Sequence, residues 1–150
     1  MPQHAISAVA LIPAPPQQVY SIIADYRDGH PRILPKPHFV SLTVEQGGVG
    51  DGTVIRFQMR LMGRIQTFRA AITEPEPGRV LVETDKQTGA TTTITVEPRD
   101  DAQHAEVTIT TATSVRNGLL GRLEAWLTTR LLHPIYVREL AQLADVVTNA

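Results

Sequence analysis

The sequence predicts an α+β protein in which a curved antiparallel sheet of about seven strands wraps around one long C-terminal helix. Two observations lead to this prediction. The middle of the chain is a succession of short apolar segments separated by turn-forming residues, whereas residues 117–147 contain no turn signal except Pro134. Such segregation of strands from helices favours a two-layer α+β fold, and the short connections favour antiparallel hairpins.

The chain is expected to begin with a strand and two short helices. Residues 5–12 are apolar and partly β-branched, which favours a strand, and the prolines at positions 13, 15 and 16 end it. Prolines also suit the first turn of a helix, so the same stretch is expected to start one. A second helix of a single turn is expected at residues 33–34. In the first helix, apolar residues recur at the spacing of one helical face, at Val19, Ile22, Ile23 and Tyr26.

The following strands are indicated by alternation of apolar and polar side chains. Within residues 53–61, every second side chain is apolar, which is the period of a strand with one buried face. The polar side chains between them, Arg56, Gln58 and Arg60, are expected on a solvated outer face. Further strands are expected at residues 65–73, 80–84, 91–97 and 105–113, with turn-forming residues between them.

The C-terminal helix is expected to be the longest element. At 1.5 Å per residue, about thirty residues span roughly 45 Å, which is enough to cross a sheet. Pro134 removes one backbone hydrogen bond and is expected to bend the helix. If Leu123 is buried, its replacement by alanine is expected to cost about 2–5 kcal/mol. One face, expected to pack on the concave side of the sheet, is formed by Leu119, Leu123, Trp126, Leu127, Val137, Leu140, Ala141 and Ala144.

Length and composition indicate a single globular domain spanning residues 1–150. The chain is 42% hydrophobic and 19% charged, as is usual for globular proteins. A net charge of -1 creates no field that would attract nucleic acid, so no nucleic-acid partner is expected. No segment approaches the ~20 apolar residues of a membrane span, and the first residues do not resemble a signal peptide. We therefore expect a cytoplasmic protein without stable membrane insertion.

Metal and thiolate chemistry find little support in the sequence. There are no cysteines, which excludes disulfides and thiolate ligands. The five histidines are scattered along the chain, and none lies three to five residues from another. Neither a metal site nor a cofactor is therefore expected.

Local motifs accompany this order of elements: the proline-rich residues 12–16 before Val19 and Tyr20, the pair Asp25-Tyr26, the proline loop at 31–35, and the glycine-rich hairpin at 48–53. Together they resemble the START and birch-pollen-allergen-like (SRPBCC) superfamily, and within it the polyketide cyclase/dehydrase and lipid-transport group. The resemblance covers nearly the whole chain. It implies the helix-grip fold, with a cavity between the sheet and the C-terminal helix, and a small hydrophobic molecule as the partner.

Three functions are compatible with such a cavity. The leading interpretation is binding or transport of a small hydrophobic ligand, such as a lipid, a polyketide or a quinone. The alternative is an acid–base enzyme of the polyketide cyclase or dehydratase type, with His133 and Arg130 as its chemical groups. A third is a protein-interaction module whose cavity is filled by its own side chains. Fold alone does not decide among them, and it leaves open both enzymatic activity and the oligomeric state, a homodimer included.

The residues expected to contact a ligand come from three parts of the chain. Arg130 and His133 fall on the apolar face of the C-terminal helix, where they either turn to solvent or bind a carboxylate, phenolate or carbonyl in a pocket. The charged loop at residues 25–32, which includes His30, either rims the cavity or is an ordinary surface loop. No pair of carboxylates in an apolar setting is apparent. The candidate ligand-binding residues are Tyr20, Phe57, Met59, Trp126, Arg130 and His133.

Overall fold

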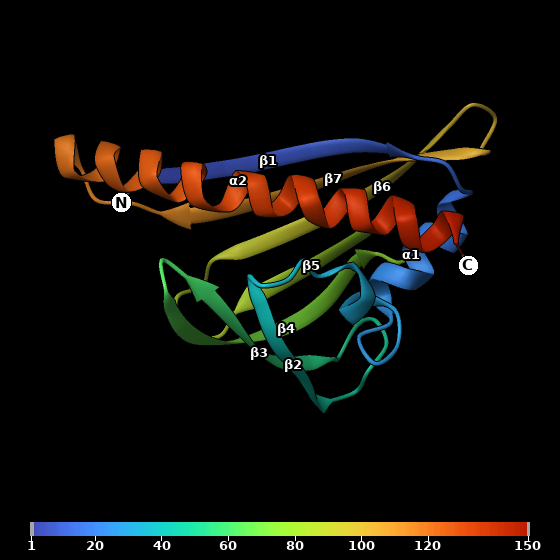
Figure 1. Cartoon of the computed structure of the whole chain (residues 1–150), viewed down its shortest axis with the longest axis horizontal. Coiled ribbons are helices and arrows are strands. Elements are labelled where there is room, and N and C mark those ends of the chain that lie inside the picture. The colour runs from blue at the N-terminus through green and yellow to red at the C-terminus, as the bar shows by residue number, and fades with distance from the viewer. Residues whose placement is uncertain (1, 150) are drawn as a thin grey trace.

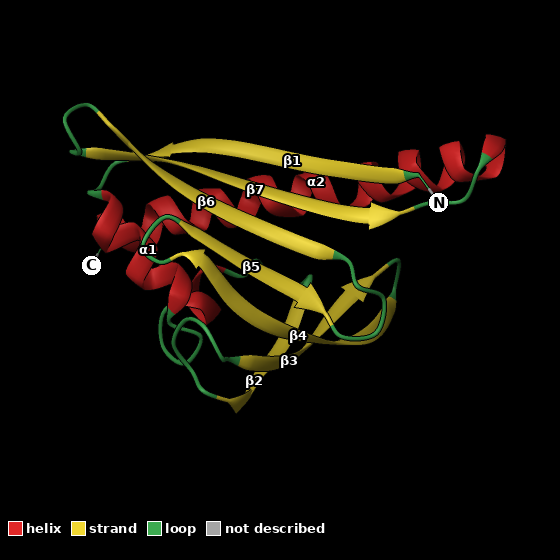
Figure 2. Cartoon of the chain, turned by 180° about the vertical axis from the view of Figure 1, so that it is seen from behind, coloured by secondary structure: helices red, strands yellow, loops and turns green. Residues whose placement is uncertain are grey.

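The computed structural model describes residues 2–149 and shows a seven-stranded antiparallel sheet that curves around one long helix (Figure 1). Viewed from behind, the sheet lies in front of this helix, so the two form separate layers (Figure 2). The strand order is β1-β7-β6-β5-β4-β3-β2, and the predicted fold class is confirmed. The elements are β1 (Gln3–Ile12), α1 (Pro16–Ala24), the 3₁₀ helix η1 (His30–Ile33), β2 (Phe39–Gln46), β3 (Val54–Leu61), β4 (Arg64–Glu76), β5 (Val80–Asp85), β6 (Thr91–Arg99), β7 (His104–Ser114) and α2 (Gly118–Thr148).

Strand β2 is the one strand that the sequence patterns did not delimit. It occupies an edge of the sheet, and its pairing with β3 shifts register twice, between Phe39 and Ser41 and between Val44 and Gln46. Each shift moves the following side chains to the other face, which interrupts the apolar–polar alternation. Strand β4 also runs further than expected, because Pro75 lies within another register shift, where a proline is tolerated.

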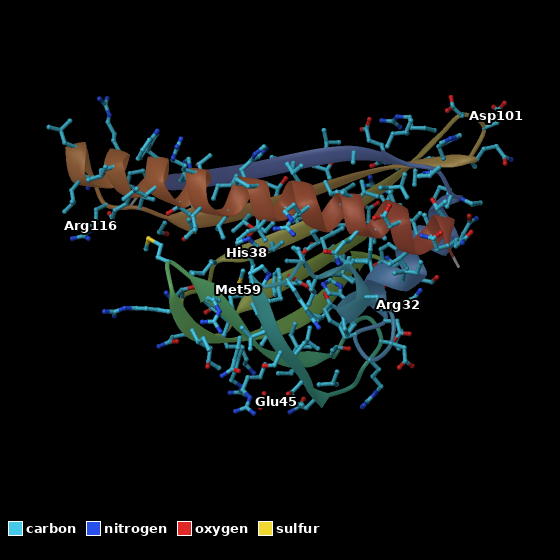
Figure 3. All side chains as sticks on the ribbon, in the orientation of Figure 1. Arg32, His38, Glu45, Met59, Asp101 and Arg116 are labelled. Atoms are coloured by element: carbon cyan, nitrogen blue, oxygen red, sulfur yellow. The ribbon has the colours of Figure 1, made fainter. Side chains whose placement is uncertain are left out.

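The alternation of β3 was interpreted correctly. Ile55 and Met59 are buried, whereas Arg56 and Arg60 are exposed on the opposite face. Figure 3 shows Met59 toward the interior, between the sheet and α2. This inward face of β3 supplies one wall of the cavity described below.

The face by which α2 packs differs from the expected one. Leu123 and Trp126 are 51% and 57% exposed, and Leu119 and Leu127 are exposed as well, so the predicted packing of this half is wrong. The first turns of α2 project past the ends of β1 and β7, with Arg116 just before them (Figures 1 and 3). There is no sheet beneath these turns to cover their leucines. The buried residues lie mainly in the second half of α2: Ile135, Tyr136, Glu139, Leu140, Leu143 and Val147.

The second half of α2 is also hydrogen-bonded to η1 and to the segment that follows it. Gln142 Nε2 donates a hydrogen bond to the carbonyl oxygen of Arg32 at 3.2 Å, and Arg138 Nη2 donates one to that of Lys36 at 3.3 Å.

The helix α2 is continuous through Pro134. Within residues 2–149, no helix is both long and apolar enough to cross a membrane.

Candidate functional site

A cavity lies between the second half of α2 and the inward face of the sheet. It has two adjoining lobes, of about 290 Å³ next to the β5–β6 turn and about 80 Å³ next to η1. Five residues line both lobes: Phe57, Met59, Glu83, Thr92 and Tyr136. The remaining walls are mainly apolar, with Leu34, Phe39, Leu42 and Ile55 in the smaller lobe and Leu61, Phe68, Ala70, Ala90 and Leu132 in the larger.

A group of polar side chains interrupts this apolar lining on one side. We call Tyr26, His30, Glu83, Tyr136 and Glu139 the polar cluster; all but Tyr26 line the cavity. The Tyr26 hydroxyl donates a 2.5 Å hydrogen bond to Glu83 Oε2, and His30 Nε2 lies 3.7 Å from the same oxygen. The rings of Tyr26 and His30 stack with their centroids 4.3 Å apart.

The position of His30 follows from the local chain geometry. Gly29 lies so close to α1 that a side chain there would collide with the backbone of Ile22. This close approach allows His30 Nδ1 to reach the carbonyl oxygen of Ile23 at 2.7 Å. Because a carbonyl oxygen can only accept, Nδ1 carries the proton, and Nε2 is the nitrogen presented to Glu83.

The two carboxyl groups of the polar cluster, those of Glu83 and Glu139, come from different layers, the sheet and α2. Glu83 follows the fully buried Leu81 by two positions on β5, so both side chains point inward. Glu139 comes from the buried face of α2, one turn after Tyr136. The Tyr136 hydroxyl and Thr111 Oγ1 form a 2.5 Å hydrogen bond, and Thr111 Oγ1 continues to Thr92 Oγ1 at 2.8 Å. The cluster is thus anchored to β5, β6, β7 and α2 at once.

Burial dominates the electrostatics of the cluster. Removal from water raises the pKa of Glu139 well above its ordinary value, and the negative charge of Glu83 raises it further. The pKa of Tyr26 is also raised, first by burial and then by Glu83. Burial likewise raises the pKa of Tyr136 to about 12. Burial and Glu83 therefore both favour the protonated form of Glu139, a carboxylic acid that can donate a hydrogen bond.

The structure brings together only some of the predicted site residues. Phe57 and Met59 line both lobes of the cavity. Tyr20 is buried, but its hydroxyl donates to Glu74 Oε2 at 2.7 Å, and it does not line the cavity. Its contact with a ligand stays a prediction.

The three candidate residues of α2 lie outside the cavity. Trp126, Arg130 and His133 are exposed and share a shallow surface depression, in which the Arg130 guanidinium is 5.5 Å from the centre of the Trp126 ring. The reason is the rotation of α2, whose apolar face in this half is turned away from the sheet. The structure therefore does not unite them with Phe57 and Met59, and a role in binding stays a prediction for them.

The polar cluster was largely missed from the sequence. The expectation that no carboxylates pair in an apolar setting is wrong, because Glu83 and Glu139 do so. His30 was considered only as part of a charged loop, although it is 3% exposed and faces the cavity. A signal was present for Glu83, which occupies an inward position two residues after Leu81. Among residues 2–149, no group of three or more histidine or acidic side chains is arranged to hold a metal ion.

Solved structures with the same architecture are known. The KanY protein is 26% identical, with a TM-score of 0.83 and coverage of 99% of both chains. A Thermus thermophilus protein, TTHA0849, is 22% identical, with a TM-score of 0.76 and coverage of 97% of both chains. The Zhui aromatase/cyclase from a Streptomyces species is 18% identical, with a TM-score of 0.73 and coverage of 96% of this chain and 93% of that one.

Sequence comparison gives the family. Among curated proteins, none is significantly similar to this chain. A family model described as polyketide cyclase / dehydrase and lipid transport matches residues 3–148. Because the match extends over nearly the whole sequence, the chain belongs to this family, which is part of the START-like helix-grip superfamily.

Proposed function

We propose that the protein binds a small, largely apolar molecule in the cavity beneath α2. The observation that carries this proposal is the cavity itself, whose larger lobe of about 290 Å³ has mainly apolar walls. Binding sites for small molecules are typically concave, with mainly apolar walls and a few polar groups, so a space of this kind between the sheet and α2 favours a ligand. It also argues against an interaction module filled by its own side chains.

Filling the cavity is expected to abolish binding. Ala70 is 4% exposed and lines the larger lobe, so the Ala70→Phe variant places a phenyl ring in the space that a ligand would use. Prodan, a neutral naphthyl ketone whose emission shifts in apolar surroundings, serves as the probe. We expect wild-type protein to bind it and the Ala70→Phe variant to bind at least about tenfold more weakly, which corresponds to ~1.4 kcal/mol.

The adjacent residue supplies the matched control. Ala71 follows on the same strand and points to the opposite face, so Ala71→Phe adds the same ring outside the cavity. This variant is expected to bind Prodan like the wild type. Equal affinity of all three proteins would contradict binding in the cavity. Native mass spectrometry of freshly purified protein, followed by organic extraction, would then identify any natural ligand.

Acid–base catalysis on a carbonyl compound is a second candidate, favoured by the polar cluster. A buried carboxylic acid, Glu139, and a second carboxylate beside a histidine, Glu83 and His30, line the same lobe. In such a reaction Glu139 donates a hydrogen bond to the carbonyl oxygen. Glu83 removes a proton from the adjacent carbon, and the electrons of the broken C–H bond form the C=C bond of an enol. The electrons of the C=O π bond move to the oxygen, which takes the proton of Glu139.

Deuterium exchange tests this second candidate directly. In heavy water, the protein is expected to accelerate exchange of the methylene protons next to the Prodan carbonyl at least tenfold over buffer, as followed by NMR. The Glu83→Gln variant should lose most of this acceleration, because an amide is not a base. Exchange at the rate of buffer alone would leave binding as the function and exclude enolisation of this ketone.

A further inference from the structure

We propose that Glu139 is a ligand-anchoring residue, which donates a hydrogen bond to the carbonyl oxygen of a neutral ligand, so that the cavity selects neutral carbonyl compounds over carboxylates. This inference rests on the proposed binding function and specifies the chemical class of the ligand. It is supported by the unused hydrogen-bonding capacity of Glu139, by its burial and by the charges that line the cavity.

The carboxyl group of Glu139 makes no hydrogen bond with any side chain or backbone group of residues 2–149, although the residue is only 5% exposed. Its neighbours in the cluster make hydrogen bonds to other residues: Glu83 accepts one from Tyr26, and the Tyr136 hydroxyl is bonded to Thr111. Buried polar groups are almost always hydrogen-bonded in native proteins. Because Glu139 lines the cavity, a ligand can supply the missing partner.

Burial and the charge of Glu83 on β5 favour the protonated form of Glu139. The other titratable groups around it are His30 from η1, Tyr136 from α2 itself, and Tyr26 behind Glu83. The two tyrosines are neutral in the neutral pH range, and Glu83 repels a second negative charge. A protonated carboxyl group has one donor, which a ketone or aldehyde oxygen can accept.

The same surroundings disfavour an anionic ligand. The acidic residues Glu83, Asp85 and Glu139 line the cavity, whereas no lysine or arginine of residues 2–149 does so. His30 is the one basic side chain on the walls, and its Nδ1 is already bonded to Ile23. A ligand carboxylate would thus lose its hydration beside Glu83 without gaining a cation, which is strongly unfavourable.

The test compares two ligands of nearly the same shape: Prodan, and the naphthoate in which a carboxylate replaces its propionyl group. Equilibrium dialysis at neutral pH is expected to show at least about tenfold tighter binding of Prodan to the wild type. Glu139→Leu removes the donor and should weaken Prodan binding about tenfold. Glu139→Gln keeps an N–H donor and should retain affinity within about threefold of the wild type.

A pH series adds a readout that a merely structural role would not change. Prodan affinity of the wild type should fall as pH rises through the range in which Glu139 ionises, because the donor is lost and a charge appears. The Glu139→Gln variant should show no such fall. Asp145→Asn, the same exchange of a carboxyl group for an amide on the exposed side of α2, is the control and should behave like the wild type.

The outcomes separate this inference from the proposed function. If Prodan binding depends on Ala70 but the naphthoate binds equally well, or Glu139→Leu leaves the affinity unchanged, the anchoring role is wrong and the cavity still binds. If Prodan binding is insensitive to Ala70→Phe, the proposed function itself fails. Melting temperatures of the Glu139 variants confirm that each is folded when its affinity is measured.

Discussion

Replacing Leu143 by alanine is expected to lower the free energy of unfolding by about 2–5 kcal/mol, whereas the same change at Leu123 should alter it by no more than ~0.5 kcal/mol. Both leucines belong to α2, but Leu143 is 1% exposed within the core and Leu123 is 51% exposed. Leu143→Ala loses the free energy gained by removing the leucine side chain from water, and it leaves a void in the core. Leu123→Ala loses few contacts.

Urea denaturation of the two variants and the wild type measures this difference. Because leucine and alanine are both good helix formers, helix propensity adds little to either change. The comparison therefore reports which half of α2 is packed on the sheet. Similar losses for the two variants would contradict the described rotation of the helix and restore the face expected from the sequence.

The stability of the wild type is expected to fall as pH rises from 5 to 7. The folded state holds the proton on Glu139, because burial raises its pKa, whereas a glutamic acid in the unfolded chain releases its proton near pH 4.3. Between these two pKa values, the unfolded state binds fewer protons than the folded state. Within that range, each pH unit lowers the free energy of unfolding by at most about 1.4 kcal/mol, the limit for one proton.

The Glu139→Gln variant should lack this contribution, since glutamine does not titrate. Its free energy of unfolding, measured with urea at pH 5, 6 and 7, is expected to rise relative to that of the wild type at each step. Asp145→Asn lies on the exposed side of the same helix and should retain the slope of the wild type. Parallel pH profiles for the wild type and the Glu139→Gln variant would show that Glu139 ionises as readily in the folded as in the unfolded chain.

The sheet could be predicted because its signals are local. Alternation in β3 assigns Ile55 and Met59 to the interior, and prolines and glycines mark the ends of most strands. Strand β2 was not delimited, since its two register shifts destroy the alternation that would reveal it. A pattern of period two can be detected only where the pairing is regular.

The orientation of α2 could not be predicted because its apolar residues do not form one stripe. Leucines at positions 119, 120, 123 and 127 are exposed, and the sequence does not say where the sheet beneath them ends. The expected core face included Leu119, Leu123 and Leu127, and Glu139 lies on the opposite side of the helix from these residues. The polar cluster depends on that rotation, since it unites Glu139 from α2 with Glu83 from β5. Long-range packing, and not a local motif, creates this site.

The irregular β2 strand has a consequence for how copies of the protein meet at high concentration. An open sheet has two edges, and a straight edge strand can pair with the edge of another molecule and so nucleate aggregation. At one edge, β1 packs against α2. At the other, the two bulges of β2 bend its row of free backbone groups, and Glu45 adds a charge on the outside (Figure 3). The distortion that hides β2 from sequence analysis thereby also protects this threonine-rich sheet from growing edge to edge.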